Sequence, residues 1–579
     1  GAVEARLEAL DAVALAGEGA HRLTLAAGER RSITVPVRGL APGIGTITLA
    51  LSGPEGPSVR RSWPIEVRPA QPVIHDREIA QIKPGESWTP PANLLARFEP
   101  GTARATLEVA PWRGFDLVGL LRRLDQYPLG CVEQTTSRAL PLLTVAELAP
   151  LAGLPVGPEL RDRLQRAVWR VADMQTADGD FGMWGPSDYS DNWLSVYALD
   201  FLTRAEAAGL HVPSETMKQG RDFLRKLTAN HNTLRQRAYA YWVLARLNEA
   251  SPGDLRYFHD VEAAKLDDPL AWAQLGAALD RIGDRARAQS AFHLSLATMG
   301  TKHHRVGPYG STLRDAAGAL TMVAEARRDE MLPAFAEKAV ALDTKTPSTQ
   351  EMAWMVLATQ AMTHGKPMTV EWGGKPLGPR APAAAPLDPA AGLALVNKGA
   401  EAVWRTVAVE GIPKTPLVAA QNGLNVTREV FTLDGEPADL AALRQNDRVV
   451  VILSGGGDGK REREISVLAL LPAGLEIEGV LVPEGNGVRE WMPEFSQPRA
   501  TVKRDDRFAA AVTLARRPEQ SKTAPPVEES DPPAGQFRVG FVARAVNVGS
   551  FTLPPVLVED MYYPAVRGNT DTGRVAIAP

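Results

Sequence analysis

Cysteine is almost absent from this sequence of 579 residues, since Cys131 is the only one. An intramolecular disulfide, a cysteine-rich zinc site and an iron–sulfur cluster are therefore excluded within the chain, because each needs at least two cysteines. A single thiol can be a small buried hydrophobe, a reactive nucleophile or one partner in another covalent link.

Long apolar runs and a charge excess are also lacking. No stretch of 18 apolar residues occurs, and the chain begins at Gly1 without a leader segment, so the chain as given is expected to be soluble. The start without Met indicates a processed form or an excised piece, from which a targeting peptide or lipid anchor would be missing. With 64 basic and 68 acidic residues, neither nucleic acid nor an anionic membrane surface is an expected partner.

The hydrophobic content of 44% is sufficient for several packed cores, and the length predicts about four domains. Residues 20–70 alternate apolar and polar positions, with Ser32–Val37 as one predicted strand, which is typical of a small antiparallel β-sandwich. From about 115 to 365 the apolar spacing becomes three and four, and prolines and glycines divide it into about a dozen helices. This pattern suits a ring of helical hairpins.

Strands return after residue 366. The segments 71–114 and 367–414 are each too short for a stable sandwich, so we predict one β-domain split by the helical insertion. In the β-rich remainder, Arg448–Leu453 and Glu464–Leu470 are predicted to pair as a hairpin, with the glycine-rich segment Gly455–Lys460 as its turn.

The most informative segment is Tyr127-Pro128-Leu129-Gly130-Cys131-Val132-Glu133-Gln134, which leads directly into a predicted helix. A thiol and a carboxamide three positions apart at a helix start can be brought together. Loss of ammonia then joins the Cys131 sulfur to the Gln134 side-chain carbonyl as an internal thioester. Such an activated acyl group is attacked by amines and hydroxyls, and the attack releases the thiol.

This segment closely resembles the thioester segment of bacterial α2-macroglobulins, which are related to eukaryotic α2-macroglobulins and complement thioester proteins. The resemblance continues through Ser137–Leu142, and Asp178–Trp184, Trp193–Phe201 and Tyr309–Ser311 are similar to that family's helical thioester domain. It covers most of the chain.

The resemblance implies a multidomain α+β fold, with an α/α toroid inserted in a split CUB domain between macroglobulin-like β-sandwiches. Its implied boundaries are a macroglobulin-like domain at 1–70, CUB halves at 71–114 and 367–414, a helical thioester domain at 115–366, and a C-terminal macroglobulin-like lid domain at 415–579.

A thioester needs a cover that excludes water, since hydrolysis would otherwise consume it. Tyr127 lies four positions before Cys131, and the sequence Met561-Tyr562-Tyr563 lies near the C-terminal end. By resemblance, Met561 and Tyr562 match a Met-Tyr pair that the C-terminal domain of bacterial members places on the thioester. Tyr127, Met561 and Tyr562 are therefore the predicted shield, and Glu133 is expected to be a local polar or structural residue.

One departure from complement-type relatives concerns histidine. Those proteins use a histidine in the helical domain to direct the acyl group to hydroxyls, whereas the corresponding segment Ser187–Asn192 contains none. This difference favours direct attack by amines such as lysine.

The resemblance implies a single-turnover covalent trap rather than an enzyme. Cleavage of a bait segment by a protease would trigger the trap, which would then capture that protease through its lysines. It also implies a monomer with no cofactor or metal and a role in bacterial defence. The implied location is the periplasm, with a parent chain lipid-anchored to the inner membrane and cell-wall synthesis proteins near that membrane as further partners.

Two other functions remain open at this stage. A cysteine peptidase could use Cys131 at the helix start with one of nine histidines as base, and a helical ring could act as a binding module without covalent chemistry. The pair His303-His304 is a weak metal candidate, because adjacent side chains on a helix point apart.

Overall fold

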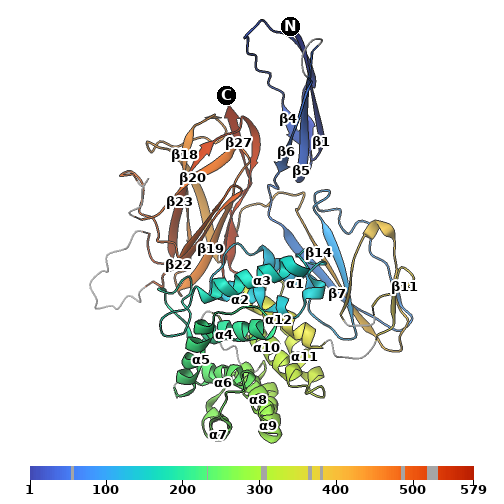
Figure 1. The fold of residues 1–579 in the computed structure, drawn as a ribbon, viewed down its shortest axis with the longest axis vertical. Helices are drawn as coiled ribbons and strands as arrows, with labels where there is room; N and C mark the ends of the chain where they lie inside the picture. The colour runs from blue at the N-terminus through green and yellow to red at the C-terminus, as the bar shows by residue number, and fades with distance from the viewer. Residues whose placement is uncertain are drawn as a thin grey trace.

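The computed structural model describes residues 1–53, 58–230, 233–300, 309–362, 368–378, 382–483, 489–517 and 532–579. Figure 1 shows a helical region at one end and three β-rich parts beside and above it. The result is a multidomain α+β architecture with the helices between β-sheet domains, as the sequence predicts.

The helical region forms a ring. Within the described residues its α-helices are α1 (Leu117–Gln126), α2 (Val132–Ala139), α3 (Gly157–Ala172), α4 (Asn192–Ala207), α5 (Ser214–Thr228), α6 (Leu234–Arg246), α7 (Pro252–Tyr257), α8 (Pro269–Arg281), α9 (Arg285–Thr298), α10 (Thr312–Glu325), α11 (Leu332–Ala341) and α12 (Thr349–Ala361). Helices α2, α4, α6, α8, α10 and α12 each contact the next, and α12 contacts α2, which closes the ring.

Inner and outer helices differ in sequence pattern. Helices α4, α8 and α10 are buried on nearly all sides, whereas α3 buries only the stripe that includes Leu160, Leu164 and Val168. A helix buried all round is apolar all round, while an outer helix needs one apolar face. This distinction explains why the three-and-four spacing is clear for some helices and weak for others.

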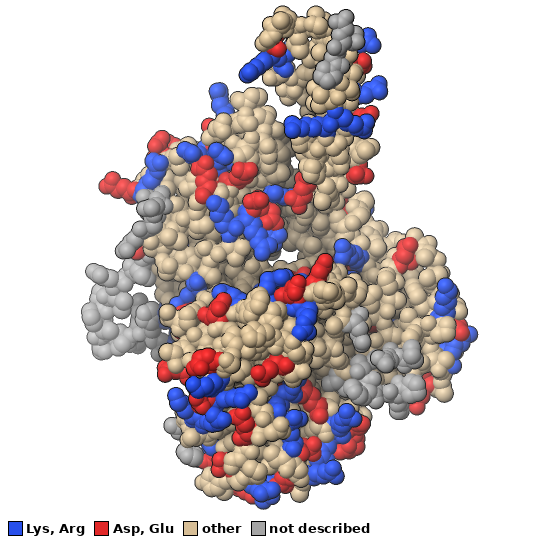
Figure 2. Space-filling view, viewed as in Figure 1, with Lys and Arg blue, Asp and Glu red and all other residues tan. Residues whose placement is uncertain are grey.

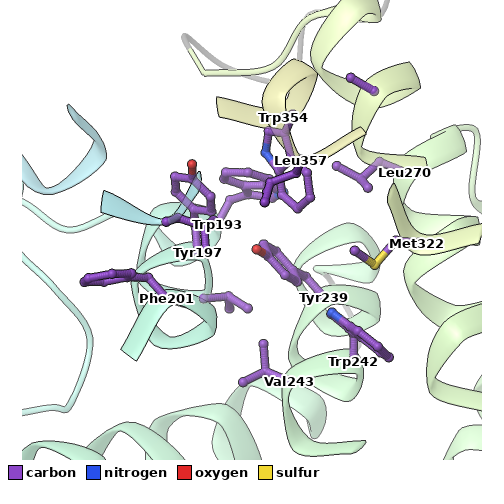
Figure 3. Packing of buried hydrophobic residues seen from close by; sticks show 14 of the residues in the cluster. Trp193, Tyr197, Phe201, Tyr239, Trp242, Val243, Leu270, Met322, Trp354 and Leu357 are labelled. Carbon is purple, nitrogen blue, oxygen red and sulfur yellow. The ribbon is translucent and has the colours of Figure 1, made fainter. Parts of the chain in front are cut away.

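Aromatic side chains fill the centre of the ring (Figure 3). The ring of Trp193 lies 5.5 Å from that of Tyr197 and 5.4 Å from that of Tyr239, and Tyr197 stacks on Trp354 at 6.0 Å. These side chains come from α4, α6 and α12, so one apolar core joins helices that are far apart in the sequence.

Two small antiparallel sheets each contain strands from both sides of the helical region. One has the order β12-β9-β14-β7 and the other β11-β10-β13-β8. Their strands are β7 (Ile74–Ile82), β8 (Ser87–Trp88), β9 (Arg104–Ala110), β10 (Val370–Trp372), β11 (Lys375–Pro376), β12 (Ala383–Pro386), β13 (Leu395–Asn397) and β14 (Val403–Gly411). Strand β14 pairs with β7 from Val403↔Ile82 to Gly411↔Ile74, and we call this pair of sheets the split sheet domain.

The C-terminal β-rich part is a packed sandwich. Its sheets have the orders β15-β26-β25-β19-β22-β21, β16-β18-β23-β20 and β17-β27-β24. The strands are β15 (Ala420–Asn422), β16 (Leu424–Thr432), β17 (Leu443–Arg444), β18 (Arg448–Gly457), β19 (Arg463–Leu470), β20 (Leu475–Leu481), β21 (Ala500–Arg504), β22 (Arg507–Leu514), β23 (Gln536–Ala545), β24 (Gly549–Leu553), β25 (Val556–Asp560), β26 (Arg567–Asn569) and β27 (Gly573–Ala578).

The predicted hairpin between Arg448–Leu453 and Glu464–Leu470 is wrong. Strand β18 pairs with β16 and β23, whereas β19 pairs with β22 and β25 in the opposite sheet. The glycine run belongs to β18 itself, because a Cβ at Gly455 would lie 2.1 Å from the Asn425 carbonyl oxygen. The glycines thus permit close strand approach, and the segment after them crosses between the two sheets.

The N-terminal part forms a sheet of order β3-β1-β5-β6 with a separate β2-β4 pair. Its strands are β1 (Ala2–Asp11), β2 (Val13–Leu15), β3 (Ala20–Thr24), β4 (Val37–Gly39), β5 (Gly43–Ser52) and β6 (Val59–Val67). The predicted strand at Ser32–Val37 is wrong up to Pro36, because that stretch is mostly exposed and Pro36 has no N–H to donate.

Surface charge is mixed. Figure 2 shows Lys, Arg, Asp and Glu side chains interspersed over the visible face of the helical region, without a continuous basic area. Among the described residues, no helix is both long and apolar enough to cross a membrane.

Candidate functional site

Cys131 stands at the N-terminus of α2, where it is the N-cap residue and is fully buried. Gly130 lets the backbone before Cys131 lie close to side chains of α2, since a Cβ at this position would lie 3.1 Å from Nη2 of Arg138 and 3.6 Å from Oγ1 of Thr135. The N–H of Val132 donates to the carbonyl of Met183 at 2.9 Å, which fixes the start of α2 against a distant loop. The segment is therefore held in one conformation.

Cys131 and Gln134 bond to each other reciprocally. The backbone N–H of Cys131 donates to Oε1 of Gln134 at 3.2 Å, and the backbone N–H of Gln134 donates to the Cys131 sulfur. This arrangement is a capping box with a thiol in the place of a hydroxyl. Both side chains have no exposed surface, so the thiol and the carboxamide are brought together away from solvent.

The amide nitrogen of Gln134 is in an unfavourable position. Nε2 is buried and has no hydrogen-bond partner among the described residues. A buried unpaired amide donor costs about 1–3 kcal/mol. It is the atom that would leave as ammonia if the Cys131 sulfur bonded to the side-chain carbon.

Burial raises the pKa of the Cys131 thiol, and the nearby Glu133 carboxylate raises it further. The backbone N–H groups of Gln134 and Glu133 and the Arg138 guanidinium oppose that rise without cancelling it. The thiol is therefore protonated at neutral pH. It lacks the thiolate character of a nucleophilic cysteine.

Glu133 joins α2 to α12. Its buried carboxylate accepts hydrogen bonds from Oγ of Ser137 at 2.6 Å and from Oγ1 of Thr349 at 2.8 Å, and Ser137 Oγ lies 3.1 Å from the Tyr197 hydroxyl. Burial raises the pKa of Glu133 to about 7, against the lowering effect of those hydroxyl donors. Glu133 thus links α2 to α12, where the ring of helices closes, beside Cys131.

Met561 and Tyr562 follow β25 and are both buried. Oδ1 of Asp560 accepts the N–H groups of Tyr562 and Tyr563 at 3.0 Å each, and Asp560 is itself paired with Arg463 at 2.8 Å. Met561 and Tyr562 belong to the same large apolar cluster as Cys131, and a negative charge on the Cys131 sulfur would raise the pKa of Tyr562. The turn that holds Asp560 therefore places both side chains over the helical region.

Tyr127 is the C-cap of α1 and packs against the same cluster. Its hydroxyl is buried without a partner among the described residues, and its carbonyl accepts from Nη1 of Arg138 at 3.3 Å. Burial raises its pKa well above the usual value, with smaller contributions from Glu559, Glu133 and Cys131. A charge on the Cys131 sulfur would thus affect both Tyr127 and Tyr562, and Met561 is the chain neighbour of Tyr562 in the same large apolar cluster.

Sequence reasoning did not identify Tyr309 as a site residue. Its ring meets that of Tyr562 edge-on at 4.8 Å, its hydroxyl lies 2.8 Å from that of Tyr189, and a negative charge on the Cys131 sulfur would raise its pKa. Tyr309-Gly310-Ser311 carries a family resemblance, but no sequence spacing links it to Cys131.

Residues of the segment Ser187–Asn192 stabilise the local fold. Asp191 caps α4 by accepting the N–H of Leu194 at 3.0 Å, and Tyr189 contacts Tyr309. His303 and His304 lie outside the described residues. Within the described part of the chain, no group of three His, Cys, Asp or Glu side chains is placed to hold a metal ion.

Comparisons with known proteins find relatives of this chain. The family model of the bacterial alpha-2-macroglobulin MG10 domain matches residues 423–522. The alpha-2-macroglobulin of Escherichia coli K12 is 30% identical over 94% of this chain, and that of Xylella fastidiosa Temecula1 is 28% identical over 97%. The chain spans only 34% and 36% of the length of those two relatives.

Solved structures extend the likeness to the whole chain. Native alpha-2-macroglobulin from Escherichia coli, from domain MG7 to the C-terminus, matches with a TM-score of 0.82 at 26% identity, over 100% of this chain and 94% of that one. Salmonella alpha-2-macroglobulin reacted with methylamine matches with a TM-score of 0.81 at 28% identity, over 100% and 39%. The chain therefore belongs to the bacterial alpha-2-macroglobulin family, and it is similar to the part of those proteins that runs from domain MG7 to the C-terminus.

Proposed function

We propose that Cys131 and Gln134 form an internal thioester and that the chain serves as the reactive part of a covalent protease trap. The observation that carries this proposal is the reciprocal bonding of the two residues in a fully buried site, with Nε2 of Gln134 unpartnered. Thioester formation removes that nitrogen as ammonia and with it the cost of an unsatisfied buried donor.

The trapping step follows from thioester chemistry. A lysine ammonium first loses a proton to water. The neutral amine nitrogen then bonds to the side-chain carbonyl carbon of Gln134, the carbon–sulfur bond breaks, and a proton from the nitrogen passes to the Cys131 sulfur. The product is an amide between the trap and the protease. The acyl group is consumed in one turnover, so the chain acts as an inhibitor and not as an enzyme.

The shield in this proposal consists of Tyr127, Met561 and Tyr562. Their burial in the cluster that contains Cys131 excludes water from the acyl carbon, and a movement of the C-terminal sandwich would expose it. Within this scheme the helical ring is the α/α toroid, the split sheet domain is a CUB domain, and residues 1–70 and 415–579 are macroglobulin-like domains. The sheet orders and the closed ring of helices support that assignment.

A cysteine peptidase is a poorer explanation. Burial raises the pKa of the Cys131 thiol, whereas a peptidase needs a thiolate, and the charged groups that shift this pKa most are Glu133 and Arg138. A non-covalent helical-ring module would not require the Cys131–Gln134 arrangement.

The wider setting belongs to the same proposal. Proteases are the covalent partners through their lysines, and cleavage of a bait segment is the trigger. The family suggests a monomer in the periplasm, a lipid-anchored parent chain, and cell-wall synthesis proteins near the inner membrane as further partners.

The test is intact mass with thiol titration, before and after methylamine. We expect a chain lighter by one ammonia, without a free thiol, until methylamine adds once and releases Cys131. Cys131→Ala should abolish this reaction for any thiol-based mechanism, whereas Gln134→Ala and Gln134→Glu should abolish it only if the thioester exists. A full-mass wild-type chain with a free thiol and an unhydrolysed Gln134 would contradict the proposal.

A further inference from the structure

A cavity of about 270 Å³ lies between the helical region and the C-terminal sandwich. Aromatic side chains from both parts line it, and these are Trp184, Tyr189, Tyr309, Tyr562 and Tyr563. The two hydroxyls of Tyr189 and Tyr309 bond to each other, and the rings of Tyr309 and Tyr562 meet edge-on. The cavity therefore has walls of neutral aromatic rings, whose faces attract cations.

The charged groups of the cavity are mainly acidic. Four carboxylates, from Asp188, Glu462, Glu464 and Asp560, line it with two guanidinium groups, from Arg463 and Arg499. Asp560 pairs with Arg463 at 2.8 Å, and Asp188 lies 3.7 Å from Arg499. These pairs leave two carboxylates, those of Glu462 and Glu464, in excess.

Glu464 is only partly satisfied. Its Oε1 accepts from Oγ1 of Thr513 at 2.7 Å, but its Oε2 is buried and has no hydrogen-bond partner among the described residues. Burial raises the pKa of this carboxyl, as do Glu462 and Asp188, while Thr513 and Arg499 lower it. The Glu464 side chain lines the cavity, so a cation there would lie beside a buried carboxyl group and offset part of the cost of its burial.

The cavity adjoins the thioester site. Tyr309 and Tyr562 line the cavity, and a negative charge on the Cys131 sulfur would raise the pKa of both. Met183 also lines it, and its carbonyl accepts the N–H of Val132 next to Cys131. A group in the cavity is thus separated from the reactive residues by side chains of the shield.

We propose that this cavity binds the alkylammonium group of an incoming amine, such as a lysine side chain, before that amine reaches Gln134. Glu464 supplies the charge, and Tyr189, Tyr309 and Tyr562 supply ring faces, an arrangement that suits ammonium and not a hydroxyl nucleophile. The inference rests on the thioester proposed above and names the chemistry by which its attacker is selected.

The test compares two nucleophiles on the 579-residue chain. Thiol release is followed with methylamine, which is a cation at neutral pH, and with hydroxylamine, which is then largely uncharged. For Glu464→Gln we expect about a three- to tenfold slower reaction with methylamine, because one charge–cation contact of this strength is lost. The rate with hydroxylamine should not change.

A matched control and a competitor sharpen the test. Glu476→Gln makes the same charge change at an exposed residue of the same sandwich and should leave both rates unchanged. Tetramethylammonium, which cannot attack a thioester, should slow the methylamine reaction of the wild-type chain and have less effect on Glu464→Gln.

The outcomes separate this inference from the function on which it rests. If the wild-type chain has no thioester by mass, the proposed function fails. If the thioester is present but Glu464→Gln slows both nucleophiles equally, or tetramethylammonium has no effect on the wild type, the ammonium site is overturned and the trap stands.

Discussion

The helical region meets its two β-rich neighbours through opposite kinds of contact. Against the split sheet domain the contact is polar and largely buried: Glu108 of β9 accepts the N–H groups of Leu117 and Val118 at 3.0 and 2.7 Å. Arg77 of β7 pairs with Asp343 at 2.6 Å. Against the C-terminal sandwich the contact is largely apolar, with Ala509, Ala511, Met561 and Tyr562 in the helical cluster.

The difference indicates which contact is permanent. Separating a buried carboxyl group from its hydrogen-bond partners leaves unsatisfied groups, so polar contacts of this kind define one geometry. An apolar contact costs only the exposure of its area when it opens, at about 25 cal/mol per Å², and it can re-form. A permanent contact on one side and a contact that can open on the other suit a reactive site from which water must be excluded until the trigger acts.

The largest effect should come from removing the cover. We expect the double variant Met561→Ala with Tyr562→Ala to lose its thioester to water about tenfold faster or more, because solvent then reaches the acyl carbon. Mass spectrometry over time without added amine measures this decay. The paired control, Met492→Ala with Phe495→Ala, removes a buried Met and an aromatic residue from another cluster of the same sandwich and should decay at the wild-type rate. Equal decay in both variants would argue against the shield.

A smaller, pH-dependent effect on stability is expected at the contact between the helical region and the split sheet domain. Burial raises the pKa of Glu108 from its usual 4.5 to about 8, with Asp116 adding to the rise and the N–H groups of Leu117 and Val118 opposing it. The folded state therefore holds this proton more tightly than the unfolded state. Its stabilising contribution is complete below pH 4.5 and is lost as the pH rises to about 8.

The variant Glu108→Gln should make the stability of the protein less dependent on pH. The apparent melting temperature of the wild type should fall between pH 5 and pH 8.5, and the fall should be smaller in the variant, because Gln cannot ionise. Glu133, Asp315 and Glu559, whose pKa values burial raises to about 7, retain part of the slope. An unchanged slope in Glu108→Gln would contradict the role of this carboxyl.

The smallest effect concerns the ring beside Cys131. Thr349→Val keeps the shape of a buried side chain but removes its hydrogen bond to Glu133, so we expect a loss of about 1–2 kcal/mol in the free energy of unfolding. Urea titration measures it, and the thioester should still form. Thr359→Val on the same helix removes only a bond to the backbone of α12 and should cost less. A larger loss at Thr359 would mean that the Glu133 contact is unimportant.

The sequence could predict the parts of the site that are contiguous. Cys131 and Gln134 are neighbours on one helix start, and the change of apolar spacing near residues 115 and 365 follows directly from which surfaces are buried. Met561 and Tyr562 became candidates only through a family resemblance, because no local pattern predicts that a turn after β25 packs into the apolar cluster of the helical region.

Other features depend on contacts that sequence patterns do not encode. Strand β1 is rich in Ala, Glu and Leu, which favour helices, yet it lies between β3 and β5, where tertiary pairing decides its conformation. The failed hairpin has the same cause, since β18 and β19 are consecutive apolar strands that belong to opposite sheets. Tyr309 and Glu108 acquire their positions only from the packed fold.

The pairing of β7 with β14 has a mechanical consequence. The first residue of β7, Ile74, lies opposite the last residue of β14, Gly411, so the two ends of the intervening chain are fastened together. A pulling force applied through the N-terminal strands and the C-terminal sandwich passes across that fastening, which opens one residue pair at a time. Until it has opened, the force along the backbone bypasses the helical region, which lies between the two strands in the sequence.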